Sequence, residues 1–264
     1  MAASESDLAP YLARAMSPPD EEVLEAIGRG AMSPADALPR AAIDRLLDPA
    51  ALAVETGWCT LPDGVGYVAV RTPMPSVSAA MVDWWFDWHP REPIRYRIWH
   101  PAAHRDNSLE PPASAGAKAH WGAIHHPVED VGVGMVHARI AFASPTQLGF
   151  STDALHDPTV GTIVCGEVGD DRRRVRHSAM AHVFLRDGDG LLLRSHFWLG
   201  ASIRPYLPAP LAAPAERLLN NRAVRRRALP AELPRALARH CAEEYANLAA
   251  LLPELYPRFG GTPG

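Results

Sequence analysis

The pattern of hydrophobic and polar positions divides the chain into a helical beginning, a strand-rich middle and a helical end. Residues 17–30 begin with Ser17, continue with prolines and acidic residues, and end at glycine, which is the usual punctuation of a short helix. Residues 33–47 repeat this pattern. Helices of this length gain most of their stability from packing. We therefore predict an N-terminal helical region, residues 1–55, that packs on the following domain or on a second subunit.

The middle of the chain changes to the alternation that is typical of β-strands. Residues 66–72 form a β-like run, whereas residues 76–89 spread their apolar positions over consecutive helical turns. Strand patterns return in three later segments, residues 132–145, 161–169 and 172–200. The last segment is divided by Asp-Gly-Asp-Gly at residues 187–190, a strong turn signal between alternating residues. These strands are expected to form an antiparallel sheet.

A long helical pattern closes the chain. It extends from about residue 232 to residue 252, follows Pro230 and is expected to end near Pro253. Several antiparallel strands followed by one long helix indicate an α+β fold, in which a curved sheet can wrap around the helix and leave a cavity. At 264 residues the chain suits one large domain, residues 56–264, with the N-terminal helical region as an appendage.

Composition and charge exclude several classes of protein. Hydrophobic residues make up 47% and charged residues 21% of the chain, which is ordinary for a globular protein. The formal net charge of -4 argues against a nucleic-acid binder, whose phosphate-binding face would be basic. No apolar run approaches the length of a membrane span, and the acidic N-terminus lacks the basic and apolar regions of a signal peptide. We expect a cytoplasmic protein that binds neither nucleic acid nor membranes.

Histidines and carboxylates are better candidate metal ligands here than cysteines. Cys59, Cys165 and Cys241 form no CxxC pair, whereas the chain has 12 histidines. His240 and Glu244 lie four residues apart in the predicted C-terminal helix, so their side chains share one face and could bind one ion. Such a pair is more often a surface hydrogen bond, and spacing does not show which other histidines converge on it.

Residues 81–104 are unusually rich in aromatic side chains. They hold four of the chain's seven tryptophans: Trp84, Trp85, Trp88 and Trp99. Tryptophans at this density mostly pack in a core, and one or two of them could line a pocket for an aromatic ligand. His89 and His100, in the same stretch, are expected to be structural.

Four segments together resemble one known family. They are residues 81–104 (MVDWWFDWHPREPIRYRIWHPAAH), 128–132 (VEDVG), 194–200 (RSHFWLG) and 240–256 (HCAEEYANLAALLPELY). In this order, over about residues 57–256, the chain is similar to the family of diacetylphloroglucinol hydrolase and phloretin hydrolase. Members of that family are zinc enzymes that hydrolyse a carbon-carbon bond between an acyl group and a polyhydroxylated aromatic ring. The resemblance implies a helix-grip fold of the Bet v 1 type with an added N-terminal helical region, and a homodimer.

The resemblance also implies a set of metal ligands. The ligands of the family match four residues of this chain: His104, Glu129, His240 and Glu244. One Zn²⁺ per chain would then be held by two imidazoles and two carboxylates. Neighbours of Glu129 are chemically able to take its place, namely Asp130, His125 and His126. Four protein ligands leave little room for water in a tetrahedral zinc site, so coordination must expand or a carboxylate must move.

Further residues around the metal follow from the same resemblance. Tyr96, Asn107 and His182 match positions that the family uses for catalysis, where they would hold ring oxygens and move protons. Their structural alternatives are a core strand residue, a turn former and a hydrogen-bonded histidine of the sheet. A second tyrosine of the family falls near His196 and Phe197, and this chain has no tyrosine there. The substrate-binding residues that we predict are Trp88, Trp99, His196 and Phe197.

These assignments predict a zinc-dependent hydrolase with retro-Claisen chemistry. Zinc would polarise the acyl carbonyl and lower the pKa of a bound water. The ring, in its keto tautomer, would receive the electron pair of the breaking carbon-carbon bond. Two other functions remain open: a non-catalytic binding module for an aromatic metabolite, and a metal-dependent polyketide cyclase or lyase on the same fold. Metal content, and release of an acid from acylated phenols, distinguish these functions.

Overall fold

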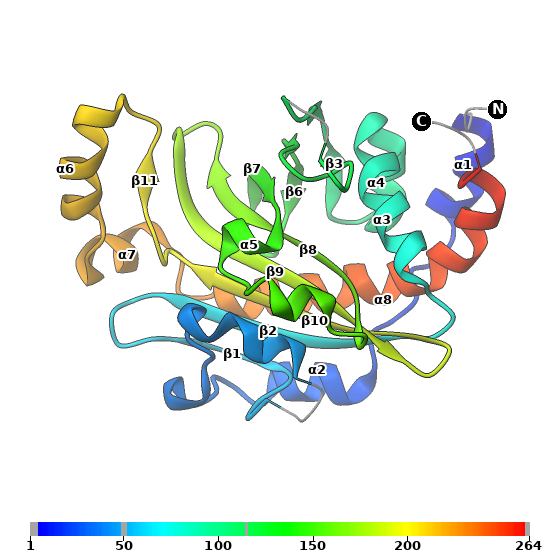
Figure 1. The fold of residues 1–264 in the computed structure, drawn as a ribbon, viewed down its shortest axis with the longest axis horizontal. Coiled ribbons are helices and arrows are strands. Elements are labelled where there is room, and N and C mark those ends of the chain that lie inside the picture. The colour runs from blue at the N-terminus through cyan, green and yellow to red at the C-terminus, as the bar shows by residue number, and fades with distance from the viewer. Residues whose placement is uncertain (1–4, 49–51, 114–115, 262–264) are drawn as a thin grey trace.

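A curved antiparallel sheet forms the centre of the computed structural model, which describes residues 5–48, 52–113 and 116–261 (Figure 1). In this part of the chain the sheet has 11 strands, and its main path runs β1-β2-β10-β9-β8-β7-β5-β4. The long strands are β2 (Gly66–Met74), β7 (Met135–Ala143), β8 (Val160–Asp170), β9 (Val175–Asp187) and β10 (Gly190–Leu199). The short strands are β1 (Gly57–Thr60), β3 (His104–Asp106), β4 (Leu109–Glu110), β5 (Ile124–His125), β6 (Val128–Asp130) and β11 (Arg204–Pro205).

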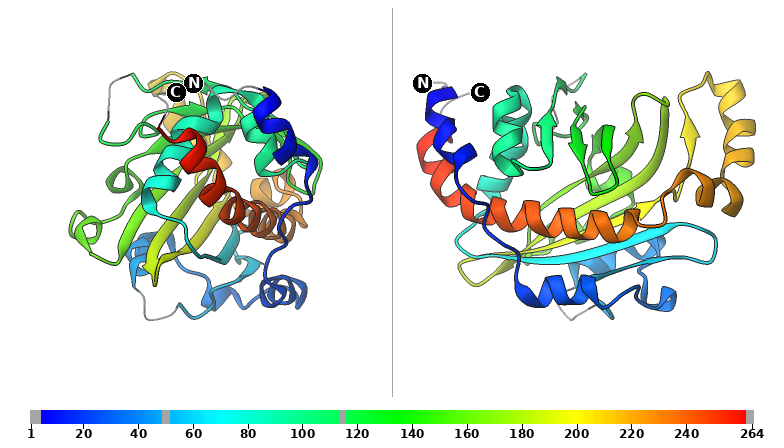
Figure 2. Two further views of the ribbon diagram at one scale, coloured as in Figure 1. Left: turned by 90° about the vertical axis from the view of Figure 1, so that its right-hand side faces the viewer. Right: turned by 180° about the vertical axis from the view of Figure 1, so that it is seen from behind.

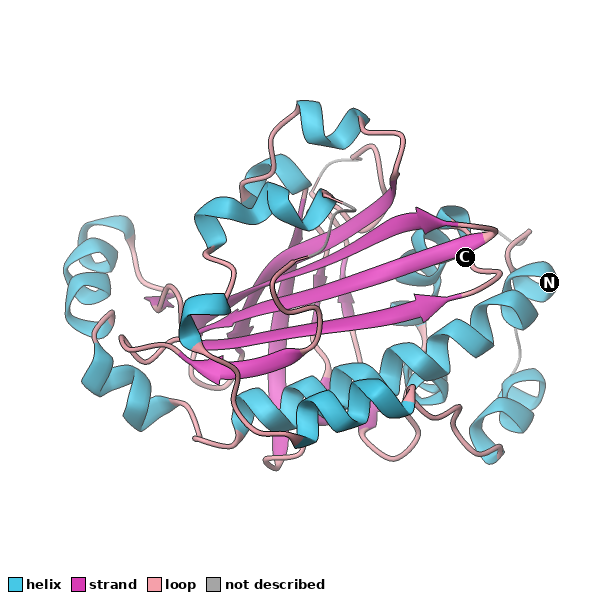
Figure 3. Cartoon of the chain, turned by 90° about the horizontal axis from the view of Figure 1, so that it is seen from below, coloured by secondary structure: helices cyan, strands magenta, loops and turns pink. Residues whose placement is uncertain are grey.

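One long helix, α8 (Leu233–Phe259), lies against the sheet and contacts β2 (Figure 2 and Figure 3). The arrangement of curved sheet and C-terminal helix confirms the predicted α+β helix-grip architecture. Within the described residues, no helix combines the length and the apolar character that crossing a membrane requires. The shorter helices are α1 (Glu5–Ala13), α2 (Glu21–Gly28), η1 (Pro34–Asp36), η2 (Arg40–Leu47), α3 (Ala79–Trp88), η3 (His89–Arg91), α4 (Pro93–Trp99), α5 (Pro145–Leu148), η4 (Asp153–His156), α6 (Ala209–Leu219) and α7 (Arg222–Ala228).

Hydrophobic clusters cover both faces of the sheet. On β2, Val68 and Val70 belong to the cluster that includes α8, whereas Tyr67 and Ala69 belong to the cluster on the other face. This division follows from the two-residue period of a strand. The second cluster also contains Ile43 of η2, so the N-terminal segments cover that face. Because both faces are covered, β2 and β10 are buried along most of their length.

Three elements lie where the sequence predicts them. The run at residues 66–72 is β2, and the helical pattern at 76–89 is α3, which begins after Ser78. The turn at residues 187–190 joins β9 to β10, with Asp187 paired to Gly190. Gly188 in this turn has φ +58°, a left-handed conformation that glycine adopts without strain.

The second N-terminal helix differs from the prediction. Residues 33–47 form two 3₁₀ segments, η1 and η2, rather than a single helix. Pro39 lies between them, and a proline lacks the backbone N–H that a continuous helix would use. The 3₁₀ turns still bury Ile43 and Leu46 against the sheet.

The C-terminal helix is longer than predicted. It continues through Pro253 and Pro257 and ends at Phe259. Proline removes a hydrogen bond and crowds the preceding turn. Leu255 and Phe259, beyond the first proline, are buried in the main core, and burial of such side chains contributes about 1.5–3 kcal/mol each. Apolar burial therefore outweighs the local preference to stop.

The N-terminal segments pack on their own chain. α1 contacts α4, and α2 contacts α8. The indole N–H of Trp58 donates to the backbone oxygen of Ile27 at 3.0 Å. On the other face, the indole N–H of Trp198 donates to the backbone oxygen of Leu38 at 2.8 Å. Indole groups, partly buried for Trp58 and buried for Trp198, thus bond to the backbone of these segments and fix the segments against the sheet.

Candidate metal centre

Four side chains with metal-binding atoms meet between two short strands and α8. In the pairing of β3 with β6, His104 lies opposite Glu129, and α8 supplies His240 and Glu244. His104 Nε2 lies 3.3 Å from Glu129 Oε2 and 3.6 Å from Glu244 Oε2. His240 Nε2 lies 3.6 Å from Glu129 Oε2 and 3.9 Å from Glu244 Oε2. Ligand atoms of His104, His240 and Glu244 lie within 4.8 Å of one another, so these three side chains could hold a metal ion.

Local structure explains why these side chains meet. The backbone N–H of His104 donates to the backbone oxygen of His100 at 2.8 Å. This hydrogen bond closes the turn that leads from the end of α4 into β3. The N–H of Asp130 donates to the oxygen of Ala103 at 3.1 Å, which joins β6 to this turn. On α8, the spacing of four residues puts His240 and Glu244 on one face. The centre therefore joins three elements that are distant in the sequence.

His104 is held in the tautomer that suits a metal ligand. Its ring is fully buried, and Nδ1 donates to the backbone oxygen of Tyr96 at 3.0 Å. The ring proton is then on Nδ1, and Nε2 keeps its lone pair. Burial lowers the pKa of His104 to about 4, so the ring is neutral at physiological pH. Nε2 is buried without a hydrogen-bond partner among the described residues. Burial of an unpaired polar atom costs about 1–3 kcal/mol of stability, and a bound ion or ligand that contacts Nε2 would remove this cost.

The electrostatics of the centre favour a cation. Burial raises the pKa of Glu244 to about 8, because a carboxylate in this place is poorly solvated. Burial would also raise the pKa of Glu129, but the imidazoles of His104 and His240 hold it well below its usual range. Burial opposes charge on His240, yet its hydrogen bond to Glu129 and the charge of Glu244 raise its pKa to about 9. Bound protons thus neutralise the negative charge of the buried carboxylates, and a divalent cation would neutralise the same charge.

Side chains of helix α4 contact three of the candidate metal ligands: His104, Glu129 and Glu244. The hydroxyl of Tyr96 donates to Glu129 Oε2, and the Tyr96 ring stacks on His104 with centroids 3.9 Å apart and planes 4° apart. The indole N–H of Trp99 donates to the backbone oxygen of Glu244 at 2.9 Å. Asn247 donates to the backbone oxygen of Trp99 at 2.8 Å. Contacts of this kind orient metal ligands and raise metal affinity.

The centre lies in the wall of a cavity of about 470 Å³, called here the metal-site cavity. Glu129, His240 and Glu244 contribute to its lining, and side chains of β7, β8, β9, β10 and α8 form much of the rest. Its volume is in the range of sites for small molecules. The candidate metal ligands thus adjoin a cavity that could hold a small molecule.

Comparison with known proteins identifies the family. A model of the DAPG hydrolase PhiG domain matches residues 38–257. The chain belongs to the DAPG hydrolase family. The 2,4-diacetylphloroglucinol hydrolase of Pseudomonas protegens is 33% identical over 226 residues, which cover 83% of this chain and 73% of that protein. The phloretin hydrolase of Eubacterium ramulus is 30% identical over 208 residues, which cover 76% of this chain and 70% of that protein.

Solved structures show a more distant likeness. Ara h 8.0201 aligns with a TM-score of 0.41 at 7% identity, covering 72% of this chain and 99% of that chain. The Zhui aromatase/cyclase from a Streptomyces species aligns with a TM-score of 0.36 at 14% identity, covering 75% of this chain and 99% of that chain.

The residues that the family resemblance assigned to catalysis line the metal-site cavity. Tyr96 comes from helix α4 rather than from a strand, Asn107 follows β3, and His182 comes from β9. Asn107 Oδ1 is buried and has no hydrogen-bond partner among the described residues. His182 Nδ1 lies 2.8 Å from Ser195 Oγ, and burial lowers the pKa of His182 to about 3. The ring of His182 is therefore neutral.

The alternatives to Glu129 in this family member have other partners. Asp130 Oδ1 accepts two backbone N–H groups of the following turn, at 2.9 and 3.0 Å. His126 lies between two carboxylates of other elements, one of them at 2.7 Å. The ring of His125 packs edge-on against an aromatic ring of β7, with centroids 4.5 Å apart. Among these side chains, Glu129 is the one within 4 Å of His104 and His240.

The predicted substrate-binding residues divide into two pairs. Trp99 and Phe197 line the metal-site cavity. Trp88 and His196 do not line this cavity. Trp88 stacks on Phe259 in the core, with centroids 5.8 Å apart. His196 lies between Ser195 and Phe197 on β10, so strand alternation points its side chain to the face of the sheet away from the cavity. There its Nδ1 lies 2.8 Å from the hydroxyl of a core tyrosine.

Tyr245 and His89 are further cavity residues whose place there was not predicted. Tyr245 follows Glu244 on α8, and its ring lies 4.9 Å from that of His182. His89, expected to be structural, does bond through Nδ1 to the backbone oxygen of Trp85 at 2.8 Å, but it also lines the cavity. The helical period gives a signal for Tyr245, because it shares a helix face with Cys241 and Leu248, which are buried. No comparable signal exists for His89, since its place depends on how α3 packs.

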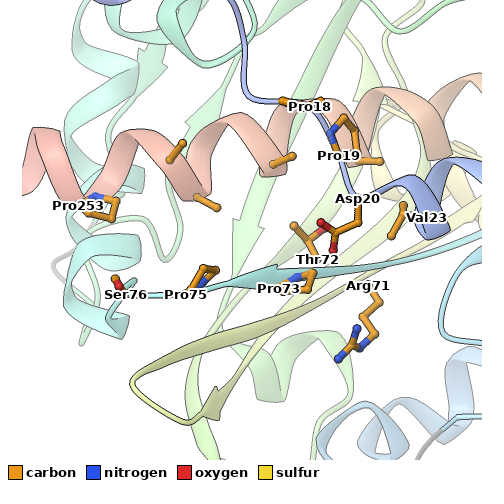
Figure 4. Close-up of a pocket in the computed structure, with 14 residues that line it drawn as sticks. Pro18, Pro19, Asp20, Val23, Arg71, Thr72, Pro73, Pro75, Ser76 and Pro253 are labelled. Atoms are coloured by element: carbon orange, nitrogen blue, oxygen red, sulfur yellow. The ribbon is translucent and has the colours of Figure 1, made fainter.

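A second hollow, of about 430 Å³, lies between the segment before α2, strand β2 and helix α8 (Figure 4). Its lining is mostly proline and alanine, with Asp20 and Arg71 as its charged residues. No histidine or cysteine lines it. This hollow lacks the group of metal ligands found in the metal-site cavity, so we place the chemistry of the protein in the latter.

Proposed function

We propose that this chain is a zinc-dependent hydrolase that cleaves the carbon-carbon bond between an acyl group and a polyhydroxylated aromatic ring. The observation that carries the proposal is the meeting of His104, His240 and Glu244, with Glu129 beside them, in the wall of a cavity. Membership of the DAPG hydrolase family supports it, since two relatives are named 2,4-diacetylphloroglucinol hydrolase and phloretin hydrolase. Acylated phloroglucinols are accordingly the substrate class that we assign.

The side chains of the centre suit zinc. Two imidazoles and two carboxylates form a nitrogen and oxygen ligand set that zinc accepts. The buried, unpartnered Nε2 of His104 supports a cation at this place, because its lone pair faces carboxylate oxygens. Bound zinc supplies Lewis-acid chemistry, polarising a carbonyl oxygen and lowering the pKa of a water molecule.

The other side chains of the cavity would hold the ring and guide protons. Asn107 Oδ1 has no protein partner and can accept a hydrogen bond from a ring hydroxyl. His182 is neutral and bonds to Ser195 through Nδ1, which leaves Nε2 for a ring oxygen. The hydroxyl of Tyr96 donates a hydrogen bond to Glu129, so Tyr96 would mainly orient that carboxylate. This division separates groups that bind substrate from groups that fix the metal ligands.

The reaction balances as a hydrolysis. The oxygen of water forms a bond to the acyl carbon, and the bond between the acyl carbon and the ring carbon breaks. Its electron pair enters the ring, which in its keto tautomer accepts the pair as an enolate. The ring carbon then takes a proton, so the products are a free acid and the deacylated phenol. The neutral, hydrogen-bonding groups near His182 suit an enolate, whose oxygen gains charge as the bond breaks.

Assay of acid release tests the proposal directly. We expect protein purified without chelators to contain one zinc ion per chain, and to release acetic acid from diacetylphloroglucinol or the corresponding arylpropanoic acid from phloretin. The acid and the remaining phenol are measured by chromatography, and the metal by mass spectrometry. Protein that binds no metal, or that binds metal and substrate without releasing acid, would contradict the proposal. The second result would favour a binding module.

Zinc is also expected to stabilise the fold. A ligand present at about 1,000 times its dissociation constant stabilises the native state by about 4 kcal/mol. For a chain of this size, 1 kcal/mol corresponds to about 2–4 °C in Tm. Adding zinc to chelator-treated protein should therefore raise Tm by roughly 8–16 °C, measured by differential scanning fluorimetry. Magnesium at the same concentration is the control, and an equal shift with magnesium would contradict a nitrogen-containing zinc site.

A further inference from the structure

The metal-site cavity has two chemically different ends. Its inner end is made of buried aromatic and hydrogen-bonding side chains: His89, Tyr96, Asn107, His125, His182 and Tyr245. Its other end carries polar residues of β8, β9 and the turn between them, among them Asp170 and Ser178. It also carries six aliphatic side chains, called here the apolar vestibule: Val133, Met135, Leu199, Leu229, Leu233 and Leu237. The four metal ligands lie between these two ends along α8 and β6.

Helix α8 gives the order of the two ends. Leu237 and Leu233 precede His240 by three and seven residues, which is about 4.5 Å and about 10 Å along the helix axis. Beyond His240 in the other direction, the indole N–H of Trp99 donates to the oxygen of Glu244 and covers the helix. The vestibule therefore begins next to the metal ligands and extends away from the inner end.

Close backbone contacts show that the vestibule residues form one wall. A Cβ placed on Gly132 would lie 3.1 Å from the Cβ of Ala236, so the loop that carries Val133 touches α8 beside Leu237. A Cβ placed on Gly200 would lie 2.8 Å from Leu229 Cδ1, so Leu229 touches the chain directly after Leu199. The loop that follows β6 therefore lies against the first turns of α8, and the end of β10 lies against the chain just before α8.

The vestibule is also the open end. The inner residues His89, His125 and Asn107 are at most 4% exposed, whereas Met135 is 47% exposed. Leu233 and Leu237 are partly exposed. Arg172 and Arg173, in the turn between β8 and β9, are exposed at the rim and mark the boundary with solvent. An apolar surface that leads from solvent to a polar interior is typical of a ligand entrance.

We infer that the polyhydroxylated ring binds at the inner end and that the acyl group lies in the apolar vestibule, so the preferred substrates carry acyl groups longer than acetyl. The inference rests on the proposed function, because it assumes that the acyl carbonyl meets the metal centre. An acetyl group ends at one methyl carbon beyond the carbonyl and leaves Leu233, Leu229 and Met135 uncovered. A straight alkanoyl or an arylalkanoyl chain reaches them and buries their apolar surface.

A series of acylphloroglucinols tests this inference. The probes are the acetyl, butanoyl, hexanoyl and phenylpropanoyl derivatives, each measured for kcat/KM by acid release and for Kd by quenching of tryptophan fluorescence, since Trp99 lines the cavity. Each buried methylene contributes up to about fourfold. Because the vestibule is partly open, we expect kcat/KM for the hexanoyl compound to exceed that for the acetyl compound by about 10- to 100-fold, with Kd falling in parallel. Equal values across the series, or the best values for acetyl, would overturn the inference.

A pair of leucine substitutions locates the effect. Leu237→Gln keeps the size of the side chain but makes this part of the vestibule polar, and it should lower the ratio of hexanoyl to acetyl kcat/KM by about fivefold or more. The matched control is Leu218→Gln, since Leu218 is 75% exposed on α6 and does not line the cavity. Its ratio should equal that of the wild type. A ratio unchanged in Leu237→Gln would overturn the placement of the acyl group in the vestibule.

The two measurements separate this inference from the proposed function. If Kd falls with chain length but no compound releases acid, the vestibule binds the acyl group and the proposed hydrolysis is wrong. If acid is released but neither kcat/KM nor Kd depends on chain length, hydrolysis stands and the inference about the acyl group is wrong.

Discussion

Replacing His240 by alanine is expected to remove the bound metal and to lower kcat/KM on acylphloroglucinols by at least about a thousandfold. His240 Nε2 lies 3.6 Å from Glu129 Oε2 and 3.9 Å from Glu244 Oε2, so its loss opens the centre between two carboxylates. Metal ions supply several kcal/mol of stabilisation to the transition state, and each 1.4 kcal/mol is about tenfold in rate. Metal content by mass spectrometry and kcat/KM by acid release measure both effects.

A second histidine provides the matched control. His156 is exposed in η4, far in the sequence from every residue of the centre, so His156→Ala should keep both metal and activity. Circular dichroism shows whether each variant is folded, and His240→Asn serves as a less disruptive substitution if His240→Ala unfolds. Retention of stoichiometric metal and near-normal activity in folded His240→Ala would exclude His240 as a ligand.

Local sequence patterns predict the framework of the fold well because they reflect local causes. Strand alternation and the turn at residues 187–190 indicate β9 and β10, and helical periodicity indicates α8. The end of α8 could not be predicted in this way. Pro253 is a local stop signal, but the burial of Leu255 and Phe259 depends on the packing of the whole domain.

The candidate site could be predicted in part, for the same reason. His240 and Glu244 share a helix face, so their pairing follows from spacing alone. His104 and Glu129 meet through the register of two strands of only three residues, and such short segments carry no readable pattern. Their assignment came from the resemblance to a family. In the structure the pairing of β3 with β6 brings these two side chains together.

The position of His196 outside the cavity lining has a clear physical origin. Strand β10 is buried on both faces, so polarity does not show which of two neighbours faces α8. His196 bonds to a tyrosine on one face, while Phe197 lines the cavity on the other. In a strand with one face exposed to solvent, the alternation of polar and apolar residues would have shown which residues face the core. The same ambiguity affects β6, where the sequence leaves Asp130 as an alternative to Glu129. The structure separates them, because Asp130 accepts backbone N–H groups and Glu129 lies within 4 Å of His104 and His240.

The substitution of Glu129 by glutamine is expected to weaken metal binding at least about 100-fold and to lower kcat/KM by a similar factor. Glu129 Oε2 lies 3.3 Å from His104 Nε2 and accepts a hydrogen bond from Tyr96, so the substitution removes a buried charge and disturbs an oriented ligand. Loss of a residue that hydrogen-bonds to a metal ligand lowers metal affinity about 10- to 100-fold, and loss of the ligand itself should lower it at least as much. Competition with a chromophoric chelator measures the affinity.

Asp130→Asn is the decisive comparison, because it makes the same chemical change one residue along the same strand. Asparagine keeps the Oδ1 that accepts the N–H groups of Gly132 and Gly134, so the turn should survive and metal affinity should change by less than about threefold. The opposite result, with Asp130→Asn losing metal and Glu129→Gln keeping it, would mean that β6 is shifted by one residue against β3. Such a shift exchanges the two faces of a strand. Neighbouring substitutions therefore test the ligand and the register of the strands that place it, in a single measurement.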